Sequence, residues 1–295
     1  MANRYSLPSR VLKLGISVVF FAGVVLRRMC TRMIGGTPAA TSVILYYHSI
    51  AAEHRAAFAR QMDTVLRLTM PIDEENVPSI VPGRYYSVIT FDDGFEDAVE
   101  NAVPELVQRK IHATFFVTVD ALGKPAAWWP PSDPERTRPL ATPEQLRSLP
   151  RERIRIAAHT MTHPRLSSLA EGEARYEIAE PRQRLRSLMG CEIKSLSFPY
   201  GDFNEDVVRW AREAGYERAY TTQHQQAVFG PHQFLVGRVK AEPTDWPLEF
   251  RLKLLGGYFW LPQAIALKRR LLRNSIGSKR RAVESPGAKN PVVQG

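Results

Sequence analysis

The chain has 295 residues, a formal net charge of +10, 44% apolar residues and 24% charged residues, so it can bury a full core. Residues 1–40 hold six basic and no acidic side chains, and residues 263–295 hold eight basic and one acidic, which leaves 26 basic and 29 acidic residues in 41–262. The body therefore carries a net charge of −3, which argues against a basic nucleic-acid-binding stripe on it, and two cysteines exclude a disulfide framework.

Residues 14–26 are thirteen apolar or small residues with basic residues on both sides. As a helix this run would span about 20 Å, which is short for a bilayer core of about 30 Å. It fits an uncleaved signal anchor, a signal-peptide core or an interfacial helix, and the lack of a clear small-x-small cleavage site favours retention. A buried core helix is the weaker alternative, and the equal basic flanks predict no membrane orientation.

A glycine-rich linker at 35–38 leads into a body in which predicted strands and helices alternate. This alternation indicates a mostly parallel sheet. The predicted strands are residues 42–48, 86–92, 111–119, 153–159, 193–200, 218–222 and 234–239. The predicted helices are residues 58–68, 95–108, 142–149, 169–189 and 204–214, and long loops are expected at 71–83 and 128–139.

The last part of the chain, from Gly256 onward, has a different composition. Residues 258–261 are aromatic and apolar, and residues 265–273 form a basic amphipathic segment that suits either a helix in a membrane interface or a solvated helix packed on the body. We expect disorder beyond Ser275. We therefore divide the chain into an N-terminal anchor or signal-like segment with its linker (1–40), a catalytic domain (41–255) and a basic tail (256–295).

Several predicted strands end in residues that carry chemistry. His48, Asp92, Asp93 and His159 each stand at such an end, as do Pro199 and Tyr200. In parallel sheets and barrels, functional residues gather at the carboxyl ends of the strands. The sequence therefore predicts one site at a single rim, although Asp-Gly after a strand is also an ordinary turn signal.

His159 and His163 are four residues apart, so both imidazoles can reach one ion. A histidine pair alone is weak evidence, but one added carboxylate completes a His, His, Asp set with open coordination positions. That set suits a catalytic divalent metal such as zinc.

Five motifs occur in a characteristic order. They are Tyr47-His48-Ser49-Ile50, residues 90–94 (TFDDG), residues 113–117 (ATFFV), residues 159–163 (HTMTH) and residues 198–201 (FPYG). In this order they resemble the polysaccharide deacetylase family, also called carbohydrate esterase family four or the NodB-homology domain. The resemblance covers roughly residues 42–240.

The resemblance implies an α/β fold, namely an irregular (β/α) barrel with mostly parallel strands. It also implies metal-dependent hydrolysis of an N-acetyl group on an amino sugar. Asp93, His159 and His163 would hold the metal, which we expect to be zinc, with cobalt, nickel or manganese as alternatives. Asp92 would be the general base toward the attacking water, and the backbone N–H of Tyr200 would help to hold the oxyanion.

Two positions depart from the family pattern. Ser197 stands where an arginine is common, two residues before Pro199, and the late Leu-x-x-His motif is absent. His48 is therefore our candidate general acid, with a hydrogen-bonded rim histidine as the alternative. Arg238 is a candidate partner that orients Asp92, and Trp128 and Pro199 are candidates for substrate positioning.

The expected protein is thus a membrane-associated deacetylase, located at a bacterial inner membrane on a side that the sequence does not specify. Its partners would be an N-acetylated glycan or a lipid-linked sugar and an anionic membrane surface, with no nucleic acid. The two departures also allow a catalytically impaired, glycan-binding pseudoenzyme. The charged ends allow a basic membrane or nucleic-acid adaptor, which is the most remote alternative.

Overall fold

The computed structural model describes residues 7–77, 79–227 and 233–267. The chain divides into two compact units, Met1–Phe259 and Trp260–Gly295, and the fold described below is that of the first unit. Residues 261–267 of the second unit are helical. Most of the predicted basic tail, including the stretch beyond Ser275, lies outside the described residues.

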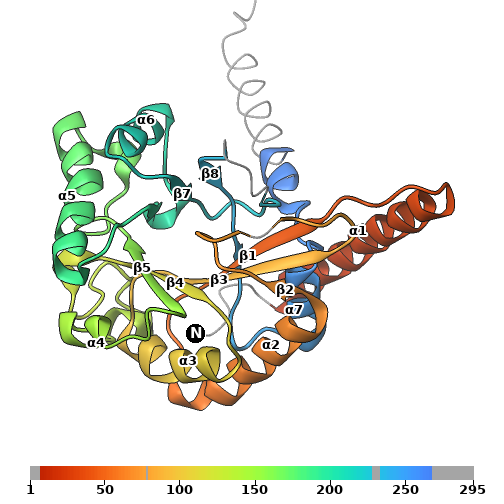
Figure 1. Ribbon diagram of the computed structural model, residues 1–295, viewed down its shortest axis with the longest axis horizontal. Helices are drawn as coiled ribbons and strands as arrows, with labels where there is room; N and C mark the ends of the chain where they lie inside the picture. The colour runs from red at the N-terminus through yellow and green to blue at the C-terminus, as the bar shows by residue number, and fades with distance from the viewer. Residues whose placement is uncertain (1–6, 78, 228–232, 268–295) are drawn as a thin grey trace, which may run out of the picture. The chain divides into compact units, whose positions relative to one another are not determined.

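The first unit alternates strands and helices along the chain (Figure 1). The helices are α1 (Leu7–Met33), α2 (Arg55–Leu68), α3 (Glu96–Gln108), α4 (Pro143–Arg147), α5 (Glu171–Met189), α6 (Glu205–Glu213) and α7 (Pro247–Leu254). The strands are β1 (Thr41–Tyr47), β2 (Met70–Pro71), β3 (Tyr85–Phe91), β4 (Ala113–Val117), β5 (Ile154–Ala158), β6 (Ser195–Ser197), β7 (Arg218–Tyr220), β8 (Leu235–Val236) and β9 (Val239–Lys240). Short 3₁₀ turns occupy Ala52–His54, Val119–Ala121, Pro134–Thr137, Leu166–Ser168 and Pro199–Gly201.

The nine strands form one parallel sheet in the order β8-β7-β6-β5-β4-β3-β1-β9, and β2 pairs with the first part of β3. The predicted parallel (β/α) architecture is therefore confirmed. All of these strands run in the same direction, so their carboxyl ends meet at one rim, as the strand-end argument requires.

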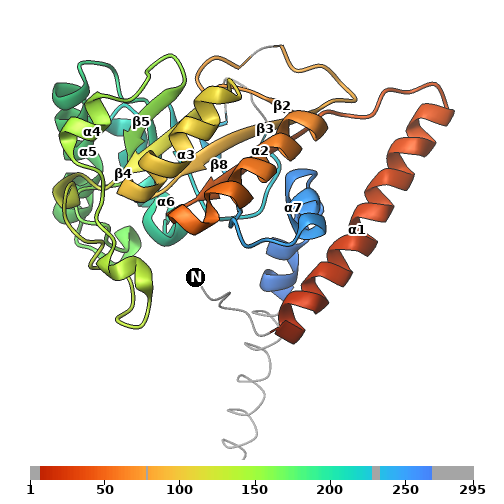
Figure 2. The ribbon, with the colours of Figure 1, turned by 90° about the horizontal axis from the view of Figure 1, so that it is seen from below.

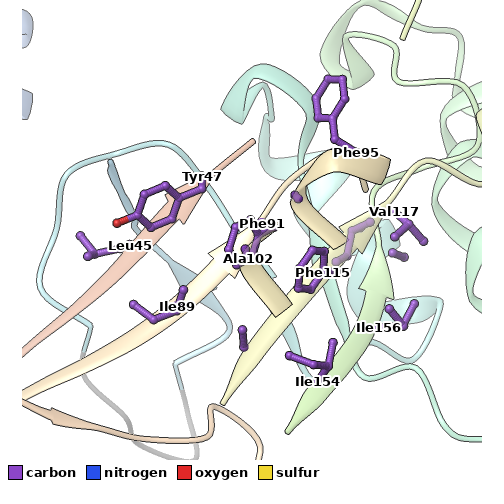
Figure 3. Packing of buried hydrophobic residues seen from close by; sticks show 14 of the residues in the cluster. Leu45, Tyr47, Ile89, Phe91, Phe95, Ala102, Phe115, Val117, Ile154 and Ile156 are labelled. Atoms are coloured by element: carbon purple, nitrogen blue, oxygen red, sulfur yellow. The ribbon is translucent and has the colours of Figure 1, made fainter. Parts of the chain in front are cut away.

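Each central strand is apolar on both faces because each face contacts a different part of the core. On β3, Ile89 and Phe91 point outward, where Phe91 stacks on Phe115 with ring centroids 4.4 Å apart. Figure 3 shows this outer cluster, with side chains of β1, β3, β4 and β5 beside Ala102 of α3. A smaller cluster, which includes Ile44, Val88, Phe116 and Tyr220, fills the inside of the curved sheet.

Local signals in the sequence account for several helix ends. Thr142 and Gln145 form a complete capping box at the start of α4, and Asn204 caps α6 by accepting a hydrogen bond from the N–H of Val207. Gly190 ends α5 in the left-handed conformation, which glycine adopts without steric cost.

The predicted single strand over residues 234–239 is wrong. These residues form two short strands on opposite edges of the sheet: β8 pairs with β7, and β9 pairs with β1. The chain crosses the open side of the barrel at Gly237 and Arg238. A Cβ on Gly237 would lie 2.3 Å from the carbonyl oxygen of Gln223, so the crossing has no room for a side chain there.

Helix α1 is longer than the apolar run at residues 14–26 from which it was predicted. Its 27 residues extend about 40 Å, so it is long and apolar enough to cross a membrane by length and composition. The core-helix alternative is not supported, because only 6% of the most apolar 18-residue segment of α1 is buried. The helix lies beside α7 in both views (Figures 1 and 2).

Candidate metal and catalytic site

Two loops at the carboxyl ends of β3 and β5 bring three metal-type ligands together. Asp93 Oδ1 lies 3.2 Å from His163 Nε2 and 3.5 Å from His159 Nε2. One ligand atom from each of the three residues falls within 4.8 Å of the others, and all three side chains are buried. Asp93 and His159 are 66 residues apart in the chain, and the pairing of β3 and β5 with β4 brings their carboxyl ends to the same rim.

The backbone around this cluster is strained in a consistent way. Five non-glycine residues of the described chain have positive φ, and four of them stand here: Asp93 (70°), Thr160 (66°), His163 (65°) and Tyr200 (59°). Such conformations cost of order 1–3 kcal/mol each and persist where the surrounding structure enforces them. Gly94 follows Asp93 because a Cβ there would lie 2.7 Å from Val117 Cγ1.

His159 is oriented as a metal-binding histidine would be, whereas the buried Nδ1 of His163 has no hydrogen-bond partner among the described residues. The Nδ1–H of His159 donates to the carbonyl oxygen of Ser197 at 2.8 Å, which leaves Nε2 with its lone pair toward Asp93. Burial lowers the pKa of His163, although the Asp93 carboxylate opposes this, so its imidazole is neutral at pH 7. Asp93 Oδ1 is buried and has no hydrogen-bond partner among the described residues. The residues present therefore fit a divalent cation with two nitrogen donors and one oxygen donor.

Two tryptophans of the 128–139 loop contact the ligands directly. The indole N–H of Trp129 donates to Asp93 Oδ2 at 3.0 Å, and Trp128 stacks on His163 with ring centroids 4.5 Å apart. Trp128, predicted to position substrate, thus lies against a ligand. Trp129 was not predicted as a site residue, and its place in a Trp-Trp pair within an otherwise polar loop was the available signal.

Asp92 lies beside the ligand set and is held by Arg238. The guanidinium donates to both carboxylate oxygens, Nη1 to Oδ1 and Nη2 to Oδ2, each at 2.7 Å. Burial raises the pKa of Asp92, but the charge and hydrogen bonds of Arg238, together with the nearby His159 and His48, outweigh burial and keep that pKa below its usual value. Asp92 is therefore an ionised carboxylate, and the predicted contact with Arg238 is present.

Arg238 is fully buried inside the barrel and makes the contacts that its charge needs. Nη2 donates to the Ser197 hydroxyl at 2.7 Å, and Nη1 donates to Thr90 Oγ1 at 3.2 Å. The guanidinium carbon lies 4.8 Å from the ring centroid of Tyr46 and 5.2 Å from that of Phe116. Ser197, the departure from the family pattern, thus leaves room for an arginine that arrives from the other side of the barrel.

His48 and Tyr200 border the same rim. The ring of His48 packs edge-on against Trp129, and burial lowers the pKa of His48 to about 4 even though Asp93 opposes that shift. His48 is therefore neutral at pH 7. The ring of Tyr200 packs edge-on against His163, and Pro199 before it is buried.

Glu177 of α5 fixes the histidine loop and was missed from the sequence. Its Oε2 accepts the N–H groups of Met161 (2.8 Å) and Thr162 (3.0 Å), and its Oε1 accepts the Thr162 hydroxyl (2.6 Å). The signal was a charged residue on the otherwise apolar buried face of α5, between Ala174 and Ile178.

Comparisons with known proteins show which family the chain resembles. Residues 82–219 match the family model described as polysaccharide deacetylase, a range that includes all three candidate ligands, Asp92 and Tyr200 but neither His48 nor Arg238. A peptidoglycan-N-acetylglucosamine deacetylase of Bacillus cereus is 29% identical over 129 residues, which are 43% of this chain and 41% of that protein. The chain spans about half the length of the curated relatives that it matches.

Two solved structures share the fold. IcaB from Ammonifex degensii has a TM-score of 0.60 and is 20% identical. The match covers 74% of this chain and 98% of the IcaB chain. The Streptococcus pyogenes deacetylase PplD, solved with acetate, has a TM-score of 0.59 and is 18% identical. The match covers 74% of this chain and 99% of the PplD chain. These two structures confirm the predicted fold class, and the family model and the curated relatives confirm the resemblance to the polysaccharide deacetylase family.

Proposed function

From a deacetylase-type barrel that resembles the polysaccharide deacetylase family in motifs and fold, we propose that the protein is a metal-dependent hydrolase. It would remove N-acetyl or similar acyl groups from amino sugars of a polysaccharide or a lipid-linked glycan. The observation that carries this proposal is the buried convergence of Asp93, His159 and His163 next to an ionised Asp92. Such an arrangement would combine a cation site with a base.

Asp93, His159 and His163 would hold the cation, which we propose to be zinc, with cobalt, nickel or manganese able to replace it. When bound, a divalent ion polarises an amide carbonyl and makes water more acidic. The chain's own groups then act around it. Asp92, oriented by Arg238, takes a proton from the attacking water.

The backbone N–H of Tyr200 is the proposed oxyanion donor. His48 is the proposed proton donor to the leaving amine. Because burial keeps its pKa near 4, His48 is neutral at rest. The proton that it gives to the leaving amine would be the one that Asp92 takes from the attacking water, passed on to His48. Trp128 and Pro199 shape the approach for the sugar, although Trp128 also supports His163.

The position of Arg238 weakens the pseudoenzyme alternative. That alternative depends on Ser197 in place of an arginine, but Arg238 supplies a guanidinium to Asp92 and donates to the Ser197 hydroxyl. A two-point ion pair fixes the direction of the carboxylate that the proposed reaction uses as its base.

We further propose that the protein works at a bacterial inner membrane. The support is α1, which is long and apolar enough to associate with a bilayer, and the clustering of basic residues at both ends of the chain.

The direct test is metal analysis of the purified full chain together with acetate release from N-acetylglucosamine oligomers and other N-acetylated amino sugars. We expect one ion per chain, loss of activity with a chelator and recovery with zinc. The Asp92→Asn variant should lose turnover but keep the metal, and the His159→Ala variant should lose turnover and metal. The control His112→Ala, outside the site, should keep turnover and metal. Activity that survives in the Asp92→Asn, His159→Ala double variant would overturn the proposal.

A further inference from the structure

Helix α1 has two different faces. The inner face, toward the body, consists of Arg10, Leu14, Ser17, Phe21, Val24 and Arg28, which are all buried or half-buried and follow one another at three- or four-residue intervals. The opposite face carries an outer stripe, Leu12, Val19, Leu26 and Met33, at seven-residue intervals. These four side chains are 62–84% exposed, and further exposed apolar residues flank them. Such a continuous apolar face is unusual on a monomeric soluble protein and marks an interaction surface.

The first end of α1 is bound to the body through Arg10. Its guanidinium donates to Glu249 Oε2 of α7 at 2.6 and 2.8 Å and to the carbonyl oxygen of Thr244 at 2.9 Å. It also lies over the Trp246 ring, 4.2 Å from the centroid. Two turns later, Ser17 is fully buried and hydrogen-bonded to Tyr258.

The second end of α1 is bound to the same body through Arg28, which is 8% exposed. Its guanidinium donates to the carbonyl oxygens of Ala39 and Gly83, both at 2.8 Å, and packs over the ring of Tyr85. Gly83 and Tyr85 lie at the amino end of β3, whereas Thr244 and Glu249 follow β9. Both ends of the helix are therefore held along one side of the barrel.

This double attachment conflicts with a helix that crosses the bilayer. Arg10 and Arg28 are 18 residues apart, or about 27 Å along the axis, close to the thickness of a hydrocarbon core. A crossing helix would carry Arg10 to the side of the membrane opposite Arg28. The Arg10–Glu249 ion pair would then break, and buried Ser17 would leave Tyr258 for hydrocarbon.

We propose that α1 is an in-plane membrane-docking helix. Its outer stripe inserts into one leaflet of an anionic bilayer, and its inner face stays on the body. Arg27 and Arg32 are exposed near the end of the stripe, and residues 1–40 contain no acid. Anionic lipid headgroups complement this charge, whereas the same segment of a second copy brings no acid to pair with it.

The position of the docked helix also bears on catalysis, and this part of the inference rests on the proposed function. Thr244, which accepts a hydrogen bond from Arg10, lines the same cavity as His48. The amino end of the docked helix therefore lies near the catalytic rim. An amino sugar held at the membrane surface, on a lipid or on nascent glycan, would reach the site from the side.

The decisive experiment is one-sided labelling of the full chain in sealed inner-membrane vesicles of both orientations. A background with Cys30→Ser and Cys191→Ser receives a single cysteine by Leu7→Cys before the stripe or Thr37→Cys just after the helix, both at exposed positions outside the stripe, and a third variant keeps the exposed native Cys191 as the body reference. We expect an impermeant maleimide to label all three from the same side. Labelling of Leu7→Cys from the side opposite Cys191 would overturn the proposal, as would a mature chain that begins after Met33.

A second experiment measures flotation of the purified full chain with vesicles of phosphatidylcholine alone or with one-third phosphatidylglycerol. We expect binding to the anionic vesicles and at least about a tenfold loss in the Val19→Glu, Leu26→Glu variant. The matched control, Leu66→Glu, changes an exposed apolar residue of α2 and should bind as the unchanged chain does. Binding to neither vesicle, or a dimer that the double variant dissolves, would overturn the proposal. None of these readouts uses acetate release, so failure of the proposed activity would leave them interpretable.

Discussion

Arg238 and Asp92 form a buried, two-point ion pair across 146 residues of sequence, with both nitrogen–oxygen distances at 2.7 Å. The pair connects the last strand crossing of the barrel to the acid at the end of β3. It fixes the direction of the Asp92 carboxylate and keeps it ionised.

We expect Arg238→Lys to reduce the rate of acetate release at least about tenfold while the metal content stays unchanged. Lysine keeps the charge but cannot reproduce the planar, two-point geometry. The control is Arg155→Lys at the amino end of β5, where Arg155 makes a similar two-point pair with Asp73 far from the rim. Equal losses of activity in the two variants would contradict an orienting role for Arg238.

Replacement of His48 by glutamine should reduce the hydrolysis rates of two substrates to different extents. Hydrolysis of an N-acetyl amide should fall about 10²–10⁴-fold, because its leaving amine needs a proton. Hydrolysis of 4-nitrophenyl acetate, whose leaving group needs none, should fall much less. His54→Gln, in the same cavity, is the control. A proton-donor role is excluded if both substrates lose activity to the same extent.

The Glu177→Ala variant should weaken metal binding about 10–100-fold, measured by competition with a chelator of known affinity. The change leaves two backbone N–H groups of the 159–163 loop without an acceptor, and each such group costs about 1–3 kcal/mol. Glu177→Gln, which retains an acceptor oxygen, should recover part of the affinity. Glu180→Ala on the same helix removes only a more exposed pair with Arg184 and should have little effect.

The Glu74→Gln variant should stabilise the protein in a pH-dependent way. Glu74 is buried, and burial raises its pKa to about 7, although a hydrogen bond from Thr114 opposes the shift. A raised pKa contributes stability below the unfolded-state value near 4.5, and this stability is lost as the pH rises through 7. The ionised carboxylate therefore costs up to about 3 kcal/mol at pH 8, which glutamine avoids.

Chemical denaturation at pH 5 and pH 8 measures this difference. We expect the gain in unfolding free energy from Glu74→Gln to be small at pH 5 and to grow by about 2–3 kcal/mol at pH 8. The same gain at both pH values would show that the carboxyl does not titrate in this range.

Much of the site was predictable because its residues stand at strand ends. The apolar runs before Asp92, His159 and Pro199 indicate strands, and the carboxyl ends of parallel strands lie at one rim. The motif order, through the family resemblance, then predicted the three metal ligands, and the structure places their donor atoms together. Trp129 and Glu177 could not be found in this way, because their contacts depend on how the 128–139 loop folds and how α5 is rotated.

The sequence by itself determined the alternation of strands and helices and the parallel sheet, because these depend on local periodicity. The prediction that Asp93, His159 and His163 form one metal set came from the family resemblance of the ordered motifs. Only the tertiary structure decided that residues 234–239 split between two edges of the sheet, which delivers Arg238 into the barrel interior. It also decided that both ends of α1 are held by one body, which the apolar run could not reveal. Both results depend on contacts between residues far apart in the chain, and no local pattern encodes them.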